Sequence, residues 1–299
     1  MRKQFFPAAK LLAIVIMLTA CGSTPEKHTG KPQTLPINTL ESSSPGAPSN
    51  TLRVASLNIA DGRGDCFNQL FVSSSAIRGN LDSIALFLAK NNIHIAALQE
   101  VDAPSSWSGN FDHARHIATE AGYRWWIQAS HASMYIADYG TAVVSSMPLM
   151  AAQRLDFTPS PPTAGKGFTL AEVLWSMPDA TEITVDVISL HMDFSRKSVR
   201  VKQIEELERA LQERTNPLIL MGDFNSEILA ERLINSAKDN KRRLHTWPAD
   251  SIPHYSYKKK RLDWIIVSGE LEFVDYTTAE ETLSDHRAIV ASLRMREPT

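Results

Sequence analysis

Apolar runs of strand length alternate with amphipathic segments of helix length from residue 52 almost to the C-terminus. Ile77, Leu81, Ile84 and Leu88 repeat with the spacing of one helix face, which predicts a helix over 76–90. The same argument predicts helices over 111–122, 199–214 and 226–238. Apolar runs rich in β-branched and aromatic residues predict strands over 52–60, 93–100, 123–130, 139–146, 168–176, 182–192, 217–225, 262–269, 270–278 and 287–295.

The order of these elements predicts the fold class. Helices lie between strands early and late in the chain, and hairpin-like strands fill the middle. This order favours a four-layer α/β sandwich, in which two packed mixed β-sheets are flanked by helices, over a doubly wound parallel sheet. The chain has no GxGxxG or GxxxxGK[ST] loop, so neither a dinucleotide-binding nor a P-loop fold is supported. No internal repeat or Pro/Gly-rich break divides residues 51–299, which we therefore interpret as one domain.

Residues 1–20 have the pattern of a secretory signal. Arg2, Lys3 and Lys10 accompany an apolar run at 11–18 that is too short to span a bilayer comfortably. The sequence LTAC then resembles the bacterial lipobox, in which the Cys, here Cys21, is acylated and becomes the new N-terminus. The alternative is a plain signal peptide that contains a cysteine.

The lipobox interpretation predicts a protein anchored by lipid in the bacterial cell envelope. Gly22 follows Cys21, with no Asp that would favour retention in the inner membrane, so the periplasmic side of the outer membrane is the expected location. Prolines among Ser, Thr, Gly and Asn fill the segment 21–50, which predicts a flexible tether between the lipid and the domain.

Charge argues against a tight nucleic-acid binder without excluding a nuclease. Without residues 1–20 the chain keeps 28 basic residues against 33 acidic ones, so no strongly basic footprint is present. The local exception is the run Lys258–Arg261, which leads into a cluster of candidate site residues. Arg261 is therefore a candidate for contacting a substrate phosphate.

Four polar clusters stand at the edges of apolar runs: LQE at 98–100, GDFN at 222–225, RLDWIIV at 261–267 and SDH at 284–286. A carboxylate at the end of a buried strand lies at a sheet edge, and several such edges can share one pocket. The pocket would gather oxygen ligands and one imidazole, a set suited to Mg²⁺ or Mn²⁺ and to phosphoryl chemistry. The expected members are Glu100, Asp223, Asp263, Asp285 and His286.

These clusters, in this order and together with LN at 57–58, YG at 139–140 and SLH at 189–191, closely resemble the endonuclease/exonuclease/phosphatase superfamily. The resemblance covers about residues 52–296, and GDFN with a terminal SDH is its most specific pair. It is closest to short bacterial hydrolases of that superfamily. It implies a divalent-metal-dependent hydrolase that acts on phosphate esters, either diesters or monoesters, with Mg²⁺ or Mn²⁺ as cofactor.

The resemblance also implies a role for each residue. Glu100, Asn58 and Asp285 are expected to bind the metal. His286, paired with Asp263, would serve proton transfer and electrostatic stabilisation. A charged Asp inside an apolar strand needs such a partner, and we expect the strand of 262–267 to lie beside the strand after SDH. The remaining expected contacts, to the attacking water or the phosphoryl group, are Asp223, Asn225, His191 and, more weakly, Tyr139.

The substrate is left open between three classes. A nuclease would use basic loops and stacking aromatics, a sphingomyelinase-like lipid phosphodiesterase would gain from a membrane anchor, and a small phosphomonoesterase would need only a basic pocket. A non-enzymatic binding module would have lost a catalytic group, whereas all of the expected ones are present. We expect a monomer. Segments 60–75 and 250–260 depart from the short bacterial relatives, so they are where we expect substrate choice to differ.

Overall fold

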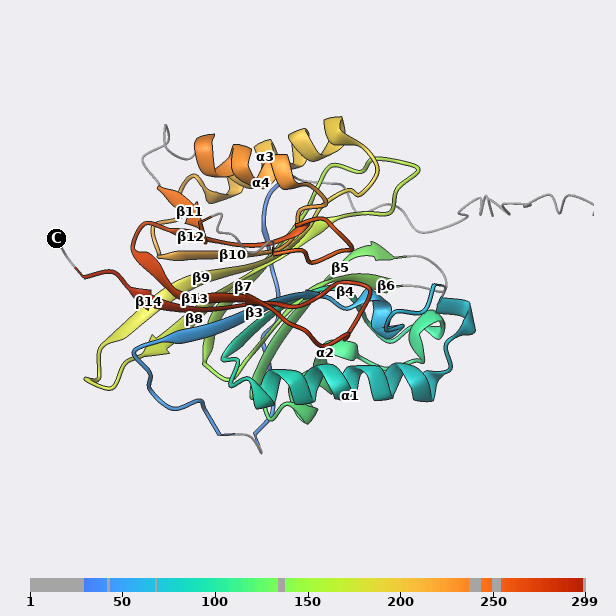
Figure 1. The fold of residues 1–299 in the computed structure, drawn as a ribbon, viewed down its shortest axis with the longest axis horizontal. Coiled ribbons are helices and arrows are strands. Elements are labelled where there is room, and N and C mark those ends of the chain that lie inside the picture. Colours follow the sequence, from blue (N-terminus) through green and yellow to red (C-terminus); the bar gives the residue numbers. More distant parts are fainter. Residues whose placement is uncertain are drawn as a thin grey trace, which may run out of the picture.

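The computed structural model describes residues 30–41, 44–67, 69–133, 138–236, 243–248 and 254–297. The predicted signal peptide and Cys21 lie outside these residues. Two sheets pack face to face, with one pair of helices on each outer side, as Figure 1 shows. The four-layer α/β sandwich is confirmed. The helices are α1 (Ser74–Lys90), α2 (His113–Glu120), α3 (Lys197–Leu211) and α4 (Glu227–Ser236), with short 3₁₀ turns η1 (Ala60–Gly62), η2 (Gln69–Phe71) and η3 (Ser106–Ser108).

Each sheet has seven strands in mixed orientation. The first sheet has the order β13 (Leu271–Thr278), β14 (Ile289–Met295), β3 (Leu52–Asn58), β4 (Ile95–Asp102), β6 (Asp138–Ser145), β5 (Trp125–Ser133) and β2 (Asn38–Thr39). The second has the order β1 (Gln33–Thr34), β7 (Leu149–Asp156), β8 (Gly167–Ser176), β9 (Glu182–His191), β10 (Leu218–Asp223), β12 (Asp263–Ser268) and β11 (Leu244–Thr246). The parallel pairs are β3–β4 and β9–β10.

The outer helices form because their apolar positions share one face. In α1 the hydroxyl of Ser73 accepts a hydrogen bond from the backbone N–H of Ala76 and caps the helix. Ile77, Leu81 and Ile84 then point at the first sheet and are at most 1 % exposed. In the space between the two sheets, apolar side chains from both inner faces make the central core.

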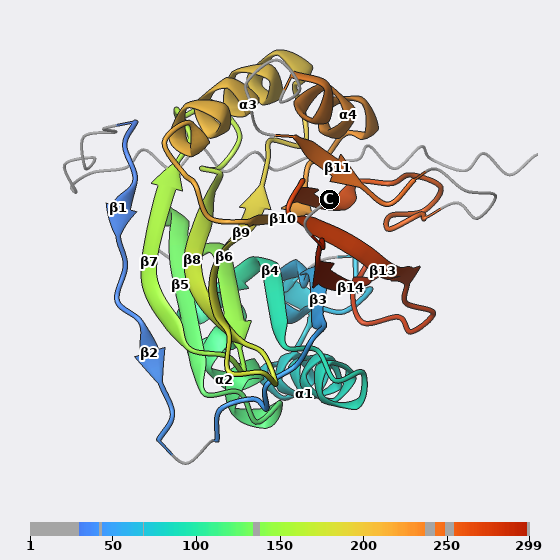
Figure 2. The same ribbon diagram turned by 90° about the vertical axis from the view of Figure 1, so that its left-hand side faces the viewer.

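The prediction of a flexible tether is wrong for residues 33–39, which are folded onto the sandwich. β1 pairs with β7 at the edge of the second sheet and β2 pairs with β5 at the edge of the first, so this segment runs across both sheets at one side of the sandwich (Figure 2). Leu35 and Ile37 pack against the central core. Trp175, which is fully buried, donates its indole N–H to the carbonyl of Ser49 at 2.7 Å. Much of the segment predicted as a tether is therefore folded onto the domain.

The helices and strands expected from the apolar pattern are all present among the described residues, with ends shifted by a few positions. Strand β7 and the short strands β1, β2 and β11 were not expected. No helix in the described part of the chain has both the length and the apolar character that crossing a bilayer requires.

Candidate active site

Three chemically active side chains stand side by side at one end of the second sheet. β9 and β10 run parallel and end together, so His191 lies opposite Asp223. β12 is antiparallel to β10 and begins where β10 ends, so Asp263 also lies opposite Asp223. All three residues are at most 2 % exposed. The ends of three strongly apolar strands therefore assemble a buried polar row, as the sequence predicted.

The GDFN segment has a backbone that suits this row. Gly222 has a φ of +149°, and a Cβ there would lie 2.0 Å from the carbonyl oxygen of Leu190 on β9, so only glycine fits. Asn225 has a φ of +50° and donates its backbone N–H to Asp223 Oδ1 at 2.8 Å. Its side-chain amide donates to Asp223 Oδ2 at 3.2 Å and to the carbonyl of Met192 at 3.0 Å. Asn225 thus fixes the orientation of Asp223.

Glu100 reaches the site through a β-bulge. On β4, Gln99 pairs with Thr141 and Val101 pairs with Gly140, which leaves Glu100 as the extra residue. Its φ of +52° is rare outside glycine and redirects the side chain from the strand's regular alternation. The carboxylate is only 3.7 Å from His191 Nε2, measured at Oε1. The bulge therefore brings a residue of the first sheet next to the polar row of the second.

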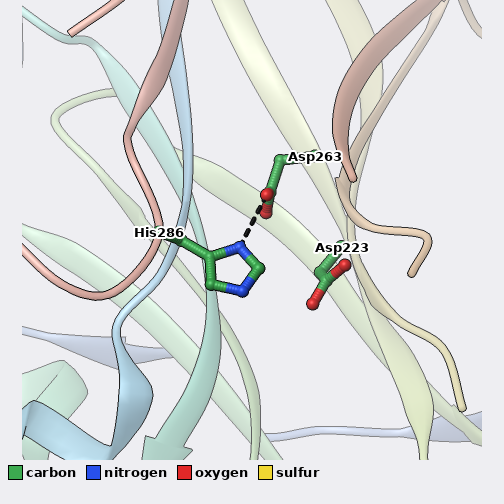
Figure 3. Close-up of side chains that lie close together, drawn as sticks. All are labelled: Asp223, Asp263 and His286. Atoms are coloured by element: carbon green, nitrogen blue, oxygen red, sulfur yellow. Dashed lines mark hydrogen bonds and ion pairs between the residues drawn. The ribbon is translucent and has the colours of Figure 1, made fainter. Parts of the chain in front are cut away.

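His286 and Asp263 make the expected hydrogen bond, with 2.7 Å between His286 Nδ1 and Asp263 Oδ2 (Figure 3). The strand arrangement behind this pair differs from the prediction. Asp263 begins β12 in the second sheet, whereas β14, the strand after SDH, belongs to the first. The two strands are therefore not hydrogen-bonded neighbours. The loop before β14 brings His286 to the common end of both sheets, where it meets Asp263.

Burial and neighbouring charges shift the pKa values of His286 and Asp223. Burial would lower the pKa of His286, but the negative charges of Asp263, Asp223 and Asp285 and the hydrogen bond that His286 donates to Asp263 raise it to about 10. Burial, together with the charge of Asp263, raises the pKa of Asp223 to about 7. At neutral pH His286 is therefore an imidazolium, and the raised pKa of Asp223 makes this carboxylate a stronger base than an exposed aspartate. A cationic acid next to a carboxylate with a near-neutral pKa is an arrangement suited to proton transfer.

The site residues lie within a region that matches a known protein family. A model of the endonuclease/exonuclease/phosphatase family matches residues 57–286, which include every side chain described above. The chain belongs to the endonuclease/exonuclease/phosphatase family. Members of this family are hydrolases that act on phosphate esters and typically depend on a divalent metal. A search of curated protein sequences gave no match.

Solved structures of the endonuclease/exonuclease/phosphatase family share the fold at low identity. A family protein from Bacteroides vulgatus matches with a TM-score of 0.65 and 16 % identity, over 82 % of this chain and 99 % of its own. The catalytic domain of human Nocturnin, solved with a bound sulfate, has a TM-score of 0.60 and 18 % identity over 88 % and 98 %. A mannosyl-6-phosphatase from Bacteroides thetaiotaomicron has a TM-score of 0.54 and 16 % identity over 81 % and 99 %.

The residues present fit the divalent cation typical of the endonuclease/exonuclease/phosphatase family. The carboxylates of Glu100 and Asp285, two of the predicted ligands, lie 3.6 Å and 2.7 Å from the same guanidinium, that of Arg63. The carboxylates of Asp223 and Asp263 offer oxygen atoms within 4.8 Å of each other. One carboxylate oxygen of Asp263 is buried without a hydrogen bond. Oxygen donors are the ligands that Mg²⁺ and Mn²⁺ prefer.

Asn58 was expected to bind the metal through its side-chain oxygen, but its amide makes hydrogen bonds within the protein. Its Nδ2 donates to Asp223 Oδ2 at 3.3 Å, and its Oδ1 accepts the backbone N–H of Ala60 at 3.0 Å. The predicted metal contact through Oδ1 would therefore use the second lone pair of that oxygen. Through the bond to Asp223, Asn58 joins the end of β3 to the polar row.

Lys166 is a site residue that the sequence did not reveal. It directly precedes β8, is 7 % exposed, and its Nζ is 3.1 Å from Nε2 of His191. Burial and the positive charge of Lys166 lower the pKa of His191 well below its usual value, so His191 is a neutral imidazole. Burial also lowers the pKa of Lys166, against the charges of Glu100 and Asp223. A lone Lys between two glycines gives no pattern, so only the fold shows this contact.

Arg63 is the second unexpected site residue. Its guanidinium lies between two predicted metal ligands, with Nη2 2.7 Å from Asp285 Oδ2 and Nη1 3.6 Å from Glu100 Oε2. The side chain is 18 % exposed. Arg63 belongs to the segment 60–75 that departs from the short bacterial relatives. Its partners are far apart in the sequence, so no spacing could have indicated the contact.

The two predicted substrate contacts have different surroundings. Tyr139 borders the site, since the Nζ of Lys166 lies 5.4 Å from the centre of its ring and the charge of Glu100 adds to the burial that raises its pKa. Arg261 is engaged elsewhere: its guanidinium stacks on Trp264 at 3.9 Å and donates to the hydroxyl of Tyr276 at 3.0 Å. The predicted phosphate contact of Arg261 thus has no support from its position.

Proposed function

We propose that the protein is an envelope-bound, lipid-anchored hydrolase of phosphate esters that depends on Mg²⁺ or Mn²⁺ and works as a monomer. The buried His286–Asp263 pair beside Asp223 is the observation that carries the proposal. The pair supplies an acid and the adjacent carboxylate supplies a base, at a sheet edge where oxygen ligands for a cation also gather. Membership of the endonuclease/exonuclease/phosphatase family supports the reaction class.

The bonding changes follow from this arrangement. Asp223 accepts a proton from a water molecule whose oxygen forms a new bond to phosphorus. The ester P–O bond breaks, and the His286 imidazolium supplies the charge and proton that the departing oxygen needs. Asp263 keeps the imidazole in its charged form and holds its orientation. The bound cation, held by Glu100, Asp285 and Asn58, would supply charge neutralisation at the phosphoryl oxygens.

In our proposal, Lys166 and His191 hold the phosphate. Lys166 directly precedes β8, and its Nζ lies against the ring of His191 at the end of β9. The two side chains therefore offer hydrogen-bond donors from neighbouring strands. Asn225 donates to both carboxylate oxygens of Asp223 and so fixes the orientation in which Asp223 meets the water. Fixing the reactants in this way is a large part of catalysis in phosphoryl transfer.

A cavity of about 410 Å³ beside Asp285 gives room for the remainder of the substrate. Its lining includes the basic side chains of Lys258 and Arg287 and the aromatic ring of Tyr255, which is 40 % exposed. Lys258 belongs to the basic run noted in the sequence, and Tyr255 to the segment that departs from relatives. Asp65 also lines the cavity, so its charges are mixed, and the exposed ring of Tyr255 favours a substrate with a planar group next to the ester.

A lipid phosphodiesterase is the second candidate, and two exposed side chains favour it. Phe67 is 96 % exposed and Phe71 is 81 % exposed, on the segment that follows Arg63 in the chain. Gln69, between them, is buried and donates to the carbonyls of Asp61 and Trp107, so the turn that presents them is held in place. Apolar side chains presented next to a hydrolytic site can enter a lipid surface.

The metal-dependent hydrolysis is tested with the purified full-length protein and bis-p-nitrophenyl phosphate. Activity should vanish with EDTA and return with Mg²⁺ or Mn²⁺. Glu100→Gln should lower both the rate and the apparent metal affinity. His116→Asn, which changes a surface histidine paired with Asp82, serves as the control and should keep wild-type activity. Full activity in EDTA would refute the metal requirement.

The substrate class is tested by comparing plasmid DNA, inositol phosphates and sphingomyelin vesicles at equal Mg²⁺. A lipid phosphodiesterase should cleave the vesicles, and Phe67→Ser with Phe71→Ser should lower that rate about tenfold without changing hydrolysis of a soluble diester. Equal losses on both substrates would exclude a lipid-contact role for these side chains. Preference for DNA would instead establish the nuclease.

A further inference from the structure

Arg63 contacts the two carboxylates that are predicted to bind the divalent cation. Its two terminal nitrogens lie 2.7 Å from an oxygen of Asp285 and 3.6 Å from an oxygen of Glu100. Nη1 is also 3.8 Å from Asp61 Oδ2. The guanidinium therefore joins carboxylates from the β4 bulge and from the loop before β14, which are the same two carboxylates expected to hold the metal.

A fixed turn places this arginine. Ala60 donates its backbone N–H to the side chain of Asn58 at 3.0 Å, and Asn80 on α1 donates to the carbonyl of Gly62 at 2.9 Å. The φ of Gly62 is +73°, and a Cβ there would lie 2.8 Å from a methyl group of Ile77. The Nε of Arg63 donates to the carbonyl of Cys66 at 3.1 Å. Because the backbone is held at several points, the contact with Asp285 is built into the fold.

A guanidinium and a divalent cation have opposing requirements in this place. Both need the carboxylate oxygens, and they repel each other because both are positive. Without a metal, Arg63 offsets the mutual repulsion of Glu100 and Asp285. When a metal binds the carboxylate oxygens that Arg63 contacts, the guanidinium must give up at least one of these two contacts. By thermodynamic linkage, whatever stabilises the arginine contact weakens metal binding by the same factor.

We propose that Arg63 is a resident counter-cation that competes with the divalent metal for Glu100 and Asp285. This inference rests on the proposed metal-dependent function. Arg63 stabilises the metal-free protein and sets a higher metal concentration for occupancy. The protein therefore acquires its cation only where the free concentration of that ion is high enough to displace the arginine.

The test measures Mg²⁺ binding directly, by calorimetry and by thermal unfolding, on the full-length protein at constant ionic strength. Arg63→Met removes the charge and keeps most of the chain length, and Arg63→Lys keeps the charge. Arg53→Met is the matched control, because Arg53 makes a similar contact to Asp275 at 3.4 Å away from the site residues. Each protein is titrated with MgCl₂ without substrate.

Arg63→Met should bind Mg²⁺ about tenfold more tightly than the wild type and should unfold at a lower temperature when metal-free. Arg63→Lys and Arg53→Met should stay within about threefold of the wild-type Kd. Equal or weaker Mg²⁺ binding by Arg63→Met would overturn the competition while leaving the metal requirement intact. Absence of Mg²⁺ binding in every protein would overturn both. If Arg63→Met does not fold, Arg63→Gln replaces it under the same criteria.

Discussion

His286 is charged at neutral pH because three carboxylates outweigh the effect of its burial. Burial alone would favour the neutral ring, yet Asp263, Asp223 and Asp285 together raise the pKa of His286 to about 10. The pKa of Asp223 is raised to about 7 because this carboxyl group is buried and lies beside Asp263. The fold thus keeps an acid and a base at the same sheet edge in complementary protonation states.

This pair of pKa values predicts the pH dependence of kcat/KM. Activity needs Asp223 without its proton and His286 with its proton, so the rate should fall below about pH 7 and above about pH 10. In Asp263→Asn the burial of His286 is no longer offset by Asp263, so the alkaline limb should move down by at least about one pH unit. The pH profiles of kcat/KM for the wild type and for Asp263→Asn are compared at the same Mg²⁺ concentration. An unchanged alkaline limb would show that His286 is not the acid.

The His286–Asp263 hydrogen bond predicts strongly overlapping effects of mutation. His286→Ala and Asp263→Ala should each lower kcat/KM by on the order of 10²-fold or more. If Asp263 acts only through the imidazole, the double variant should lose far less than the product of the two. Steady-state kinetics on a soluble diester measures this. Multiplicative losses would show that the two residues serve separate steps.

At the scale of single elements, the close approach of β10 to β9 depends on Gly222. An alanine there would need an unfavourable φ and would place its Cβ 2.0 Å from the carbonyl oxygen of Leu190. Gly222→Ala should therefore lower the free energy of unfolding by about 2–4 kcal/mol. Gly79→Ala in α1 is the control, since nothing lies within 4 Å of its added Cβ. It should raise stability by about 0.5–1 kcal/mol in denaturant titrations.

The elements that the sequence predicted are those with long, regular apolar patterns. Strand β7 was missed because LMAAQRLD has few strongly apolar residues, and β1 was missed because two residues carry no period. The pairing of β12 was predicted wrongly because an apolar strand does not reveal which sheet it joins. The contact between Asp263 and His286 was still predicted, since it needs only that both lie at the same end of the sandwich.

The site was predictable as far as its residues sit in recognisable motifs. Asp223 ends one apolar strand, Asp263 begins another and His286 lies in the loop before a third, and the fold brings them together. Lys166 and Arg63 sit in Gly-containing loops, and their partners are distant in sequence. Their positive charges are nonetheless central to the electrostatics of the pocket. Such residues become visible only when the loops are placed against the sheet ends.

At the scale of the whole molecule, the lipid anchor remains a prediction that depends on Cys21. Cys21→Ala should release the protein from the membrane fraction or block its maturation, and incorporation of radiolabelled palmitate should be lost. Cys66→Ala is the control, because Cys66 belongs to the folded domain and leaves the lipobox unchanged. Retention of Cys21→Ala in membranes at the wild-type level would contradict the lipoprotein interpretation.

The docking of residues 33–39 on the sandwich limits how far an anchored enzyme could search. With 21–50 fully extended the domain could stand roughly 100 Å from the lipid, at about 3.5 Å per residue. Gln33 is held against β7, so only the residues from Cys21 to Gln33 remain to span the gap. Their greatest extension is roughly 40 Å. An enzyme tethered at this distance would reach only a thin layer above the membrane. It would therefore act on substrates that lie in the membrane surface or diffuse along it.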